Sequence, residues 1–236
     1  MFSPILTSAV LITSPLQFVL NAIYLVPALV LGLVLHEVAH AAVAVARGDQ
    51  TPRVDGRLSL HPRQHLDPLG TLAVFFVHFG WARPLRLNPY RLRGSLDLAL
   101  VWLAGPLASL LLAIGLSIPV KVLLASGFVG LDSPIFQLLL VAFYFNVVLA
   151  VVNLLPIPGL DGYNILSALF RRRFARFFLQ VDNNRQAILV TVILTILLAP
   201  FVLSTLRISD SGSVFDLVYD PIAGALLGSS VRPTGF

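Results

Sequence analysis

The stretch LALVWLAGPLASLLLAIGLSIPV, residues 98–120, runs for 23 residues without a charged side chain. A helix needs about 20 apolar residues to cross the hydrocarbon core of a bilayer, so this run is long enough to span a membrane. Residues 187–206 form another uncharged run of 20 residues, and residues 135–160 are as apolar apart from three amide side chains. These runs predict an all-α polytopic membrane protein.

The composition indicates the same class. Hydrophobic residues make up 57% of the 236 residues and charged residues only 11%, whereas soluble domains carry about 25% charged residues. The chain has no cysteine, which excludes disulfides, thiolate metal sites and cysteine nucleophiles. The net charge of +5 does not indicate nucleic-acid binding, because the arginines lie in the connections between apolar runs. We expect a single domain over residues 1–236, embedded in the lipid bilayer.

The arginines also predict an orientation. Segments 47–66, 83–97 and 161–186 hold most of them, whereas 121–134 has one lysine balanced by one aspartate. Basic connections stay on the cytoplasmic side, so we expect the first three segments inside and the last one outside. Residues 68–82 then have both ends in the cytoplasm and are short for a span, which predicts a re-entrant segment.

Two segments complete the expected fold. Residues 18–46 predict a spanning helix, preceded by either another span or an interfacial segment over 1–17. In TPRVDGRLSLHP, residues 51–62, apolar and polar residues alternate around the turn pair Asp55-Gly56. This pattern predicts a small embedded or interfacial β-hairpin, with an irregular loop as the alternative. The complete fold would have about five to six transmembrane helices.

The segment LVLHEVAHAAVA, residues 33–44, places ionisable groups inside an apolar run. No charged residue precedes it, and Glu37 is the only glutamate of the chain. Positions i and i+4 of a helix share one face, so His36 and His40 can hold one metal ion, with Glu37 beside it. Two imidazoles suit zinc, which lowers the pKa of a water to about 7, and a neighbouring carboxylate can then accept the proton.

A structural explanation of these histidines is a hydrogen bond to a neighbouring helix. However, ionisable groups at membrane depth are costly and usually functional. Three of them at metal-binding spacing therefore favour a metal site.

A catalytic zinc site needs a third protein ligand. The segment NLLPIPGLDG, residues 153–162, favours Asp161, because its prolines break the apolar helix and its glycines allow an irregular backbone. Such backbone survives at membrane depth only where it is buried in protein or lines a wet cavity. An ordinary Pro-Gly turn capped by an aspartate is the alternative. The other candidate ligands are His61, His65, Asp67 and His78.

Asn153 lies near the end of the same apolar helix. Its amide can donate to a substrate carbonyl or to a developing oxyanion. It can equally make a hydrogen bond between helices, as asparagines in membranes often do. Position alone does not choose between the two roles.

HEVAH followed by NLLPIPGLDG resembles the site-2 proteases, the intramembrane zinc metalloproteases. Four longer segments resemble the short bacterial and archaeal branch, which has no PDZ or CBS domain. They are GRLSLHPRQHLDPLGTLA (56–73), GWARPLRLNP (80–89), LAGPLASLLLA (103–113) and FNVVLAVVNLLPIPGLDG (145–162). The resemblance covers about residues 20–205 and departs at Ser109, where the family usually has asparagine.

The resemblance implies one Zn²⁺ per chain, bound by His36, His40 and Asp161. It also implies Glu37 as the general base and Asn153 as the group that binds the oxyanion or positions the substrate. The implied reaction is hydrolysis of peptide bonds within or near the transmembrane segments of membrane-protein substrates. The implied location is a prokaryotic cell (inner) membrane, with the active site toward the cytoplasmic side.

A substrate strand could pair with the edge of the expected hairpin, which makes Val54 and Leu58 candidate substrate-binding residues. Other classes compete with the protease. Proteases that trim prenylated proteins resemble this chain less, and an LDG-type aspartate is not their third ligand. A membrane metal transporter or channel should repeat its ligands along a path. A catalytically inactive metal-binding relative is less expected, because the four motif residues are intact.

Overall fold

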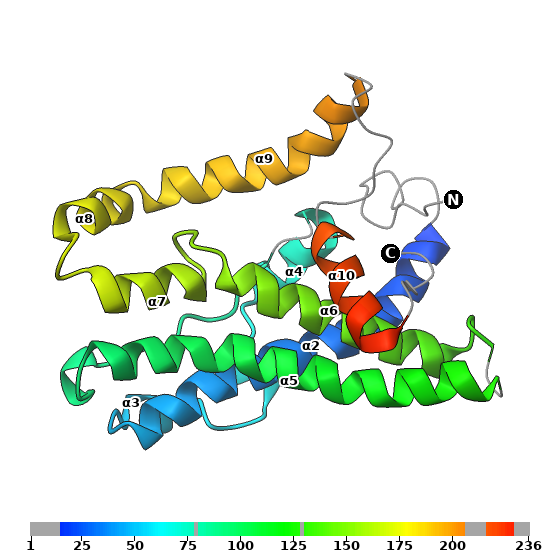
Figure 1. Cartoon of the computed structure of the whole chain (residues 1–236), viewed down its shortest axis with the longest axis horizontal. Coiled ribbons are helices and arrows are strands. Elements are labelled where there is room, and N and C mark those ends of the chain that lie inside the picture. Colours follow the sequence, from blue (N-terminus) through cyan, green and yellow to red (C-terminus); the bar gives the residue numbers. More distant parts are fainter. Residues whose placement is uncertain (1–14, 78–79, 128–129, 206–215, 229–236) are drawn as a thin grey trace.

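The computed structural model describes residues 15–77, 80–127, 130–205 and 216–228, which are almost entirely helical (Figure 1). Among these residues there is no β-strand, only an isolated bridge between Leu66 and Ala82. The helices are α2 (Pro15–Ala46), α3 (Thr51–Val54), α4 (Pro68–Val77), α5 (Ser95–Ser126), α6 (Pro134–Leu154), α7 (Asp161–Phe170), α8 (Ala175–Asn183), α9 (Arg185–Thr205) and α10 (Asp216–Leu227), with 3-10 turns η1 (Pro62–Gln64) and η2 (Pro89–Arg91).

Three helices of the described residues are long and apolar enough to cross a membrane. They cover Ala22–Ala46 in α2, Ser95–Ser126 in α5 and Pro134–Asn153 in α6. The all-α class is therefore confirmed for the described residues, and three of their helices are candidate membrane spans. The number of five to six spans stays a prediction. Helix α9 contains most of the apolar run at 187–206, but it is not among the three candidate spans. Residues 1–14, where a preceding span or interfacial segment was predicted, lie outside the described residues.

The core forms where α2, α5 and α6 pack together. One face of α6 is fully buried through residues three and four positions apart: Phe136, Leu140, Phe143 and Val147. This spacing keeps side chains on one face of a helix, here against Ala113 and Val120 of α5. Helix α10 covers the same cluster with Ala223 and Leu227.

Small residues let the spanning helices approach closely. A Cβ atom on Gly32 of α2 would come within 2.9 Å of the Phe145 ring and 3.0 Å of the Asn146 Oδ1. Without a hydrophobic driving force in lipid, such close van der Waals packing is a main source of association between membrane helices. Asn146 itself is fully buried and donates to the Ala142 carbonyl of its own helix, so it serves packing.

The prediction of a β-hairpin over residues 51–60 is wrong. The chain forms the helical turn α3, in which Val54 N–H donates to Gln50 O and Asp55 N–H donates to Thr51 O. Asp49 accepts hydrogen bonds from both the amide and the hydroxyl of Thr51, which holds the start of the turn. These local side-chain bonds compete successfully with strand pairing. Without a strand edge, the reason for choosing Val54 and Leu58 as substrate contacts no longer applies.

The segment 68–82 begins and ends at one place. Leu66 and Ala82 form the isolated bridge, and Arg83 N–H donates to His65 O at 2.7 Å. The Arg57 side chain binds the residues that follow this segment by donating to Arg83 O and Pro84 O. Helix α4 occupies the first part of the segment. This pairing of its two ends agrees with a segment that enters and leaves on one side, and the re-entrant path stays a prediction.

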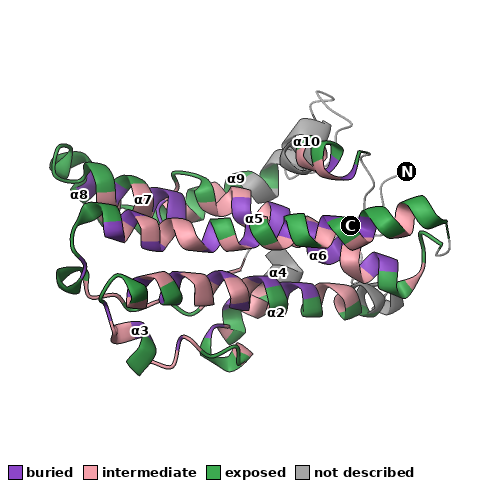
Figure 2. Ribbon diagram, turned by 60° about the horizontal axis from the view of Figure 1, so that its bottom comes forward, coloured by how far each residue is buried: buried purple, intermediate pink, exposed green. Residues whose placement is uncertain are grey.

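The arginine-rich connections gather at one end of the long axis. Helix α2 ends there and α5 begins there, and α3 and α8 lie at the same end in both views (Figures 1 and 2). Residues 47–66, 83–94 and 171–176 therefore share one end of the bundle, and the connection that follows α5 lies at the other.

Candidate metal centre

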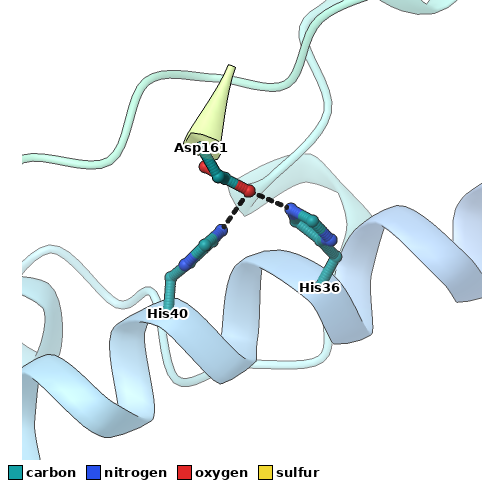
Figure 3. Close-up of side chains that lie close together, drawn as sticks. All are labelled: His36, His40 and Asp161. Carbon is teal, nitrogen blue, oxygen red and sulfur yellow. Dashed lines mark hydrogen bonds and ion pairs between the residues drawn. The ribbon is translucent and has the colours of Figure 1, made fainter. Parts of the chain in front are cut away.

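Helix α2 presents His36 and His40 on one face, four residues apart. Their rings lie edge to face with centroids 4.8 Å apart, and both are buried, with exposed fractions of 3% and 1%. Figure 3 shows both rings pointing from α2 toward the same carboxylate. His40 precedes the last residue of α2, Ala46, by six positions, so the site lies roughly 9 Å of helix rise from the arginine-rich end.

The predicted break in the apolar helix is confirmed, and it brings the carboxylate to the histidines. Helix α6 ends at Leu154, an irregular segment follows, and Asp161 is the first residue of α7. A Cβ atom on Gly162 would collide with the Leu154 carbonyl oxygen. Glycine is therefore required for α7 to begin so close to the end of α6.

The three side chains converge on one point. Asp161 Oδ2 lies 3.0 Å from His36 Nε2 and 3.2 Å from His40 Nε2. One potential ligand atom from each residue falls within 4.8 Å of the other two, and all three residues are buried. Among the described residues this is the only such group of three histidine, cysteine or acidic side chains.

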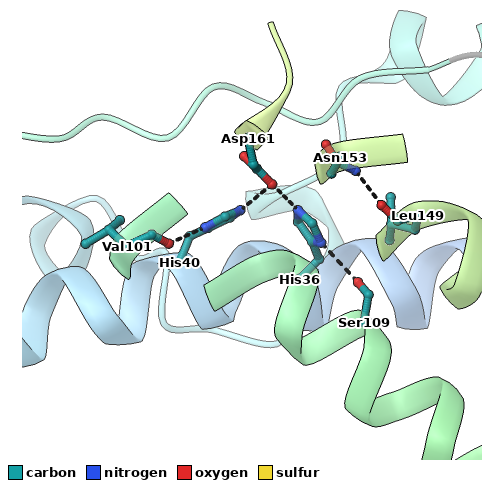
Figure 4. Close-up of polar contacts among 7 residues, drawn as sticks. All are labelled: His36, His40, Val101, Ser109, Leu149, Asn153 and Asp161. Carbon is teal, nitrogen blue, oxygen red and sulfur yellow. Dashed lines mark hydrogen bonds and ion pairs between the residues drawn. The ribbon is translucent and has the colours of Figure 1, made fainter. Parts of the chain in front are cut away.

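Helix α5 fixes how both imidazoles are turned (Figure 4). His40 Nδ1 lies 2.7 Å from the Val101 carbonyl oxygen, which can only accept, so Nδ1 carries the proton. His36 Nδ1 lies 3.0 Å from Ser109 Oγ. Hydrogen bonds of this kind orient histidine ligands and direct the lone pair of the other nitrogen to the metal.

The donor set fits a zinc ion. In its neutral form, with the proton on Nδ1, His40 directs an unshared electron pair at Asp161 Oδ2, and a cation between these two atoms would stabilise the arrangement. Two imidazole nitrogens and one carboxylate oxygen are typical ligands of catalytic zinc, which also keeps one position open. A Cβ atom on Gly105 of α5 would overlap His40 Nε2 and lie 2.6 Å from His36 Nε2, so this glycine keeps the space free.

The two residues predicted to act in catalysis lie near the centre without joining it. Glu37 follows His36 in α2, is half-buried, and makes no hydrogen bond or ion pair with another residue that the structure describes. Asn153, in the last turn of α6, donates from Nδ2 to the Leu149 carbonyl at 2.9 Å (Figure 4). Its amide is thus bonded to its own helix.

The other candidate ligands have other contacts. The buried His65 lies with Nε2 2.6 Å from the Ser59 carbonyl oxygen, and the exposed His61 accepts from Arg63 N–H. Asp67 accepts from Gly70 N–H and so caps α4, which is the structural role expected for an aspartate in this turn. His78 lies outside the described residues.

Sequence reasoning missed the contribution of α5. Ser109 Oγ and the Val101 carbonyl contact the histidine rings, and Gly105 leaves room for them, although none of the three residues belongs to the group of potential ligands. The signal available was the small-residue pattern LAGPLAS within an otherwise bulky apolar run. Small residues in a spanning helix indicate close packing, and here the close neighbours are the imidazoles.

A polar cluster joins α7 to α8. Asp182 accepts from Tyr163 OH at 2.6 Å and from Arg171 Nη2 at 2.7 Å. Partial burial alone would raise the pKa of Asp182, but these two hydrogen bonds outweigh it and lower the pKa below its usual value. Burial and the bond to the carboxylate raise the pKa of Tyr163 to about 12. Asp182 of α8 thereby contacts both the first turn of α7, through Tyr163, and the residue that follows its last turn, Arg171.

The fold and the site define a membrane-embedded protein with a buried centre of two histidines and one aspartate. The family model for Peptidase family M50 matches residues 129–199. The chain is 42% identical over 154 residues to "Putative zinc metalloprotease YwhC" of Bacillus subtilis (strain 168), which covers 62% of this chain and 68% of that protein. The chain therefore belongs to peptidase family M50, the site-2 protease family, and the resemblance seen in the sequence is confirmed.

Two further relatives are named "Putative zinc metalloprotease Rip2". The protein of Mycolicibacterium smegmatis is 32% identical over 167 residues, and that of Mycobacterium tuberculosis is 34% identical over 161 residues. Each alignment covers 64% of this chain and 59% of the relative, so the chain spans about three fifths of their length. No solved structure matches the chain.

Proposed function

We propose that this protein is an intramembrane zinc metalloprotease that hydrolyses peptide bonds within or near transmembrane segments of other proteins. The observation that carries the proposal is the convergence of His36, His40 and Asp161 on one point inside a membrane-spanning bundle. Membership of family M50 and the names of the relatives support a zinc protease. One zinc ion per chain would be held by these three residues.

Zinc at this site would polarise the scissile carbonyl and make a water acidic enough to be deprotonated near pH 7. Glu37 supplies the base: it neighbours His36 on α2 and has no described partner that would compete for the proton. The same carboxyl group then returns the proton to the amine that leaves. A carboxylate in this position contributes typically 10²–10⁴-fold to the rate.

Asn153 supplies a donor for the oxyanion in this proposal. Its Nδ2 donates to the Leu149 carbonyl in the structure, so it must exchange this partner for the substrate. Leu149 O is the acceptor four residues back in the same helix, which leaves that carbonyl able to keep its backbone bond when the amide turns away. Asn153 would therefore be recruited when substrate arrives.

The substrate would be a transmembrane protein segment that reaches the site from the surrounding lipid. Its carbonyls are tied into helical hydrogen bonds, so it must unwind locally before water can attack. The arginine-rich end of the bundle supports a cytoplasmic location of the centre in a prokaryotic inner membrane, because basic connections stay inside.

The experiment compares the wild-type chain with Glu37→Gln, both purified and placed in lipid nanodiscs with a single-span substrate. We expect Glu37→Gln to retain zinc and helix content and to lose cleavage by about 10²-fold or more. Asp132→Asn, which neutralises a carboxylate in the connection between α5 and α6, is the matched control and should cleave normally. Cleavage by Glu37→Gln at the wild-type rate would refute the proposed base, and wild-type protein without zinc would refute the enzyme class.

A further inference from the structure

Helix α8 has two apolar faces, of which only one is covered. Phe178 is buried against α7, where its ring lies 5.8 Å from that of Tyr163. Phe174, the residue before α8, and Phe177, in its first turn, are 51% and 58% exposed. Burial of Phe178 accounts for the folding of α8 onto α7. It leaves the two exposed phenylalanines unexplained.

The same short segment carries free positive charge. Arg172, Arg173 and Arg176 are exposed, and none of them forms an ion pair with a residue that the structure describes. Arg171 differs, since it is bound to Asp182 and lies over the Phe178 ring at 5.6 Å. Three guanidinium groups therefore remain available to an external anion.

The position of the segment suggests what covers it. Helices α7 and α8 lie at the arginine-rich end of the bundle, and α9 returns from α8 along the bundle (Figure 1). Figure 2 shows that α8 is largely exposed at this end. The segment is the turn at 171–174 followed by the first turn of α8, and it presents exposed aromatic rings next to exposed arginines. At a membrane surface such a segment places its rings at the acyl boundary and its cations among the headgroups.

We propose that residues 171–177 form a binding site for anionic phospholipid. Arg172, Arg173 and Arg176 bind the headgroup phosphates, and Phe174 and Phe177 insert beside the acyl chains. Negative headgroups complement the three unpaired guanidinium groups, and the lipid tails cover the two exposed rings. The Tyr163–Asp182–Arg171 cluster fixes this site to α7, the helix that begins with Asp161.

The test uses the full chain in nanodiscs of phosphatidylcholine mixed with phosphatidylglycerol, and native mass spectrometry counts the lipids that stay bound. We expect the wild type to retain phosphatidylglycerol preferentially. The triple variant Arg172→Gln/Arg173→Gln/Arg176→Gln should lose this preference by about tenfold. The matched control Arg53→Gln/Arg63→Gln/Arg86→Gln removes the same charge from exposed arginines of other connections and should retain it. An equal loss in both triples, or no preference in the wild type, would overturn the proposal.

A second measurement locates the rings. Because the chain has no cysteine, Phe177→Cys can carry a single spin label in the full-length protein. We expect the label to be accessible to oxygen and shielded from a water-soluble nickel complex. In the mass-spectrometry experiment, inorganic phosphate should not displace the bound lipid. A label that is open to the nickel complex would place this face against water or a soluble partner and contradict the proposal. Neither readout depends on proteolysis, so the site can fail while the proposed enzyme stands.

Discussion

The metal centre and the connection at residues 47–66 both contain buried aspartates, but the two carboxylates have different kinds of partner. Asp49 is fully buried and accepts bonds from the Thr51 amide and hydroxyl and from Asn88 N–H. Burial alone would raise the pKa of Asp49, but these bonds lower it instead. Asp161 Oδ2 instead lies between two imidazole nitrogens, and the Nδ1 proton of His40 is directed at the Val101 carbonyl.

Asp49 therefore has a structural role, whereas Asp161 is proposed as a metal ligand. Both carboxylate oxygens of Asp49 accept hydrogen bonds from the protein, so its hydrogen-bonding capacity is met without a ligand. Asp161 has only the two imidazole nitrogens beside it, and in the proposed function a zinc ion joins the three side chains. If the account is correct, the metal centre depends on α5 and α7, and changes in α3 have little effect on the protein.

The largest effect is expected at Gly105. In Gly105→Ala, the new Cβ would overlap the His40 ring, so bound zinc should fall from about one per chain to a small fraction of that value. Gly115→Ala is the control on the same helix, because its Cβ would have no atom within 4 Å. Metal analysis and circular dichroism measure zinc and helix content. A Gly105→Ala protein with full zinc would show that the imidazoles do not hold the positions described.

A smaller loss is expected at Ser109. Ser109→Ala removes the oxygen beside His36 Nδ1, and loss of such an orienting partner lowers metal affinity by about 10–100-fold. Competition with a zinc chelator measures the affinity. Ser117→Ala is the matched control, since that hydroxyl is also buried in α5 but donates to Ile114 O. Equal affinities of the two variants would mean that Ser109 does not orient the ring.

The next effect concerns the cluster that holds α7. The pKa of Asp182 is lowered in the folded state, so its contribution to stability is present above about pH 4, the unfolded value, and is lost as pH falls through the folded value. Because this side chain is partly exposed, the contribution should be about 1 kcal/mol or less. Asp182→Asn should lower the melting temperature by a few degrees at pH 7 and show a weaker acid dependence than the wild type. If Asp182→Asn and the wild type melted at the same temperature both at pH 7 and at acidic pH, this role of Asp182 would be contradicted.

The smallest effect is expected at Val54, which is 82% exposed in α3. Alanine is the better helix former, so Val54→Ala should leave stability unchanged or raise it by up to about 0.5 kcal/mol. In a paired strand the same change would lower stability, because valine is favoured there. Thermal unfolding in detergent measures the sign of the stability change. A clear loss of stability in Val54→Ala would favour the β-hairpin over the helical turn.

The comparison also explains what could be predicted from the sequence. The shared face of His36 and His40 on α2 follows from their spacing, and the break before Asp161 follows from the prolines that precede it, because these patterns have few alternative structures. The hairpin prediction was wrong because apolar and polar residues can alternate in an exposed connection without forming a strand. Here the hydrogen bonds of Asp49 with Thr51 favour a helical turn. The partners on α5 could not be predicted, since a distant glycine or serine acquires its role only through tertiary packing.

The central claim is that His36, His40 and Asp161 hold one zinc ion, and X-ray absorption at the zinc edge of the purified chain tests it most directly. We predict two imidazole nitrogens at about 2.0–2.1 Å with oxygen completing the shell. In Asp161→Ala we predict zinc loss or an altered shell. A zinc-free wild type, or an unchanged spectrum at full occupancy in Asp161→Ala, would contradict the account.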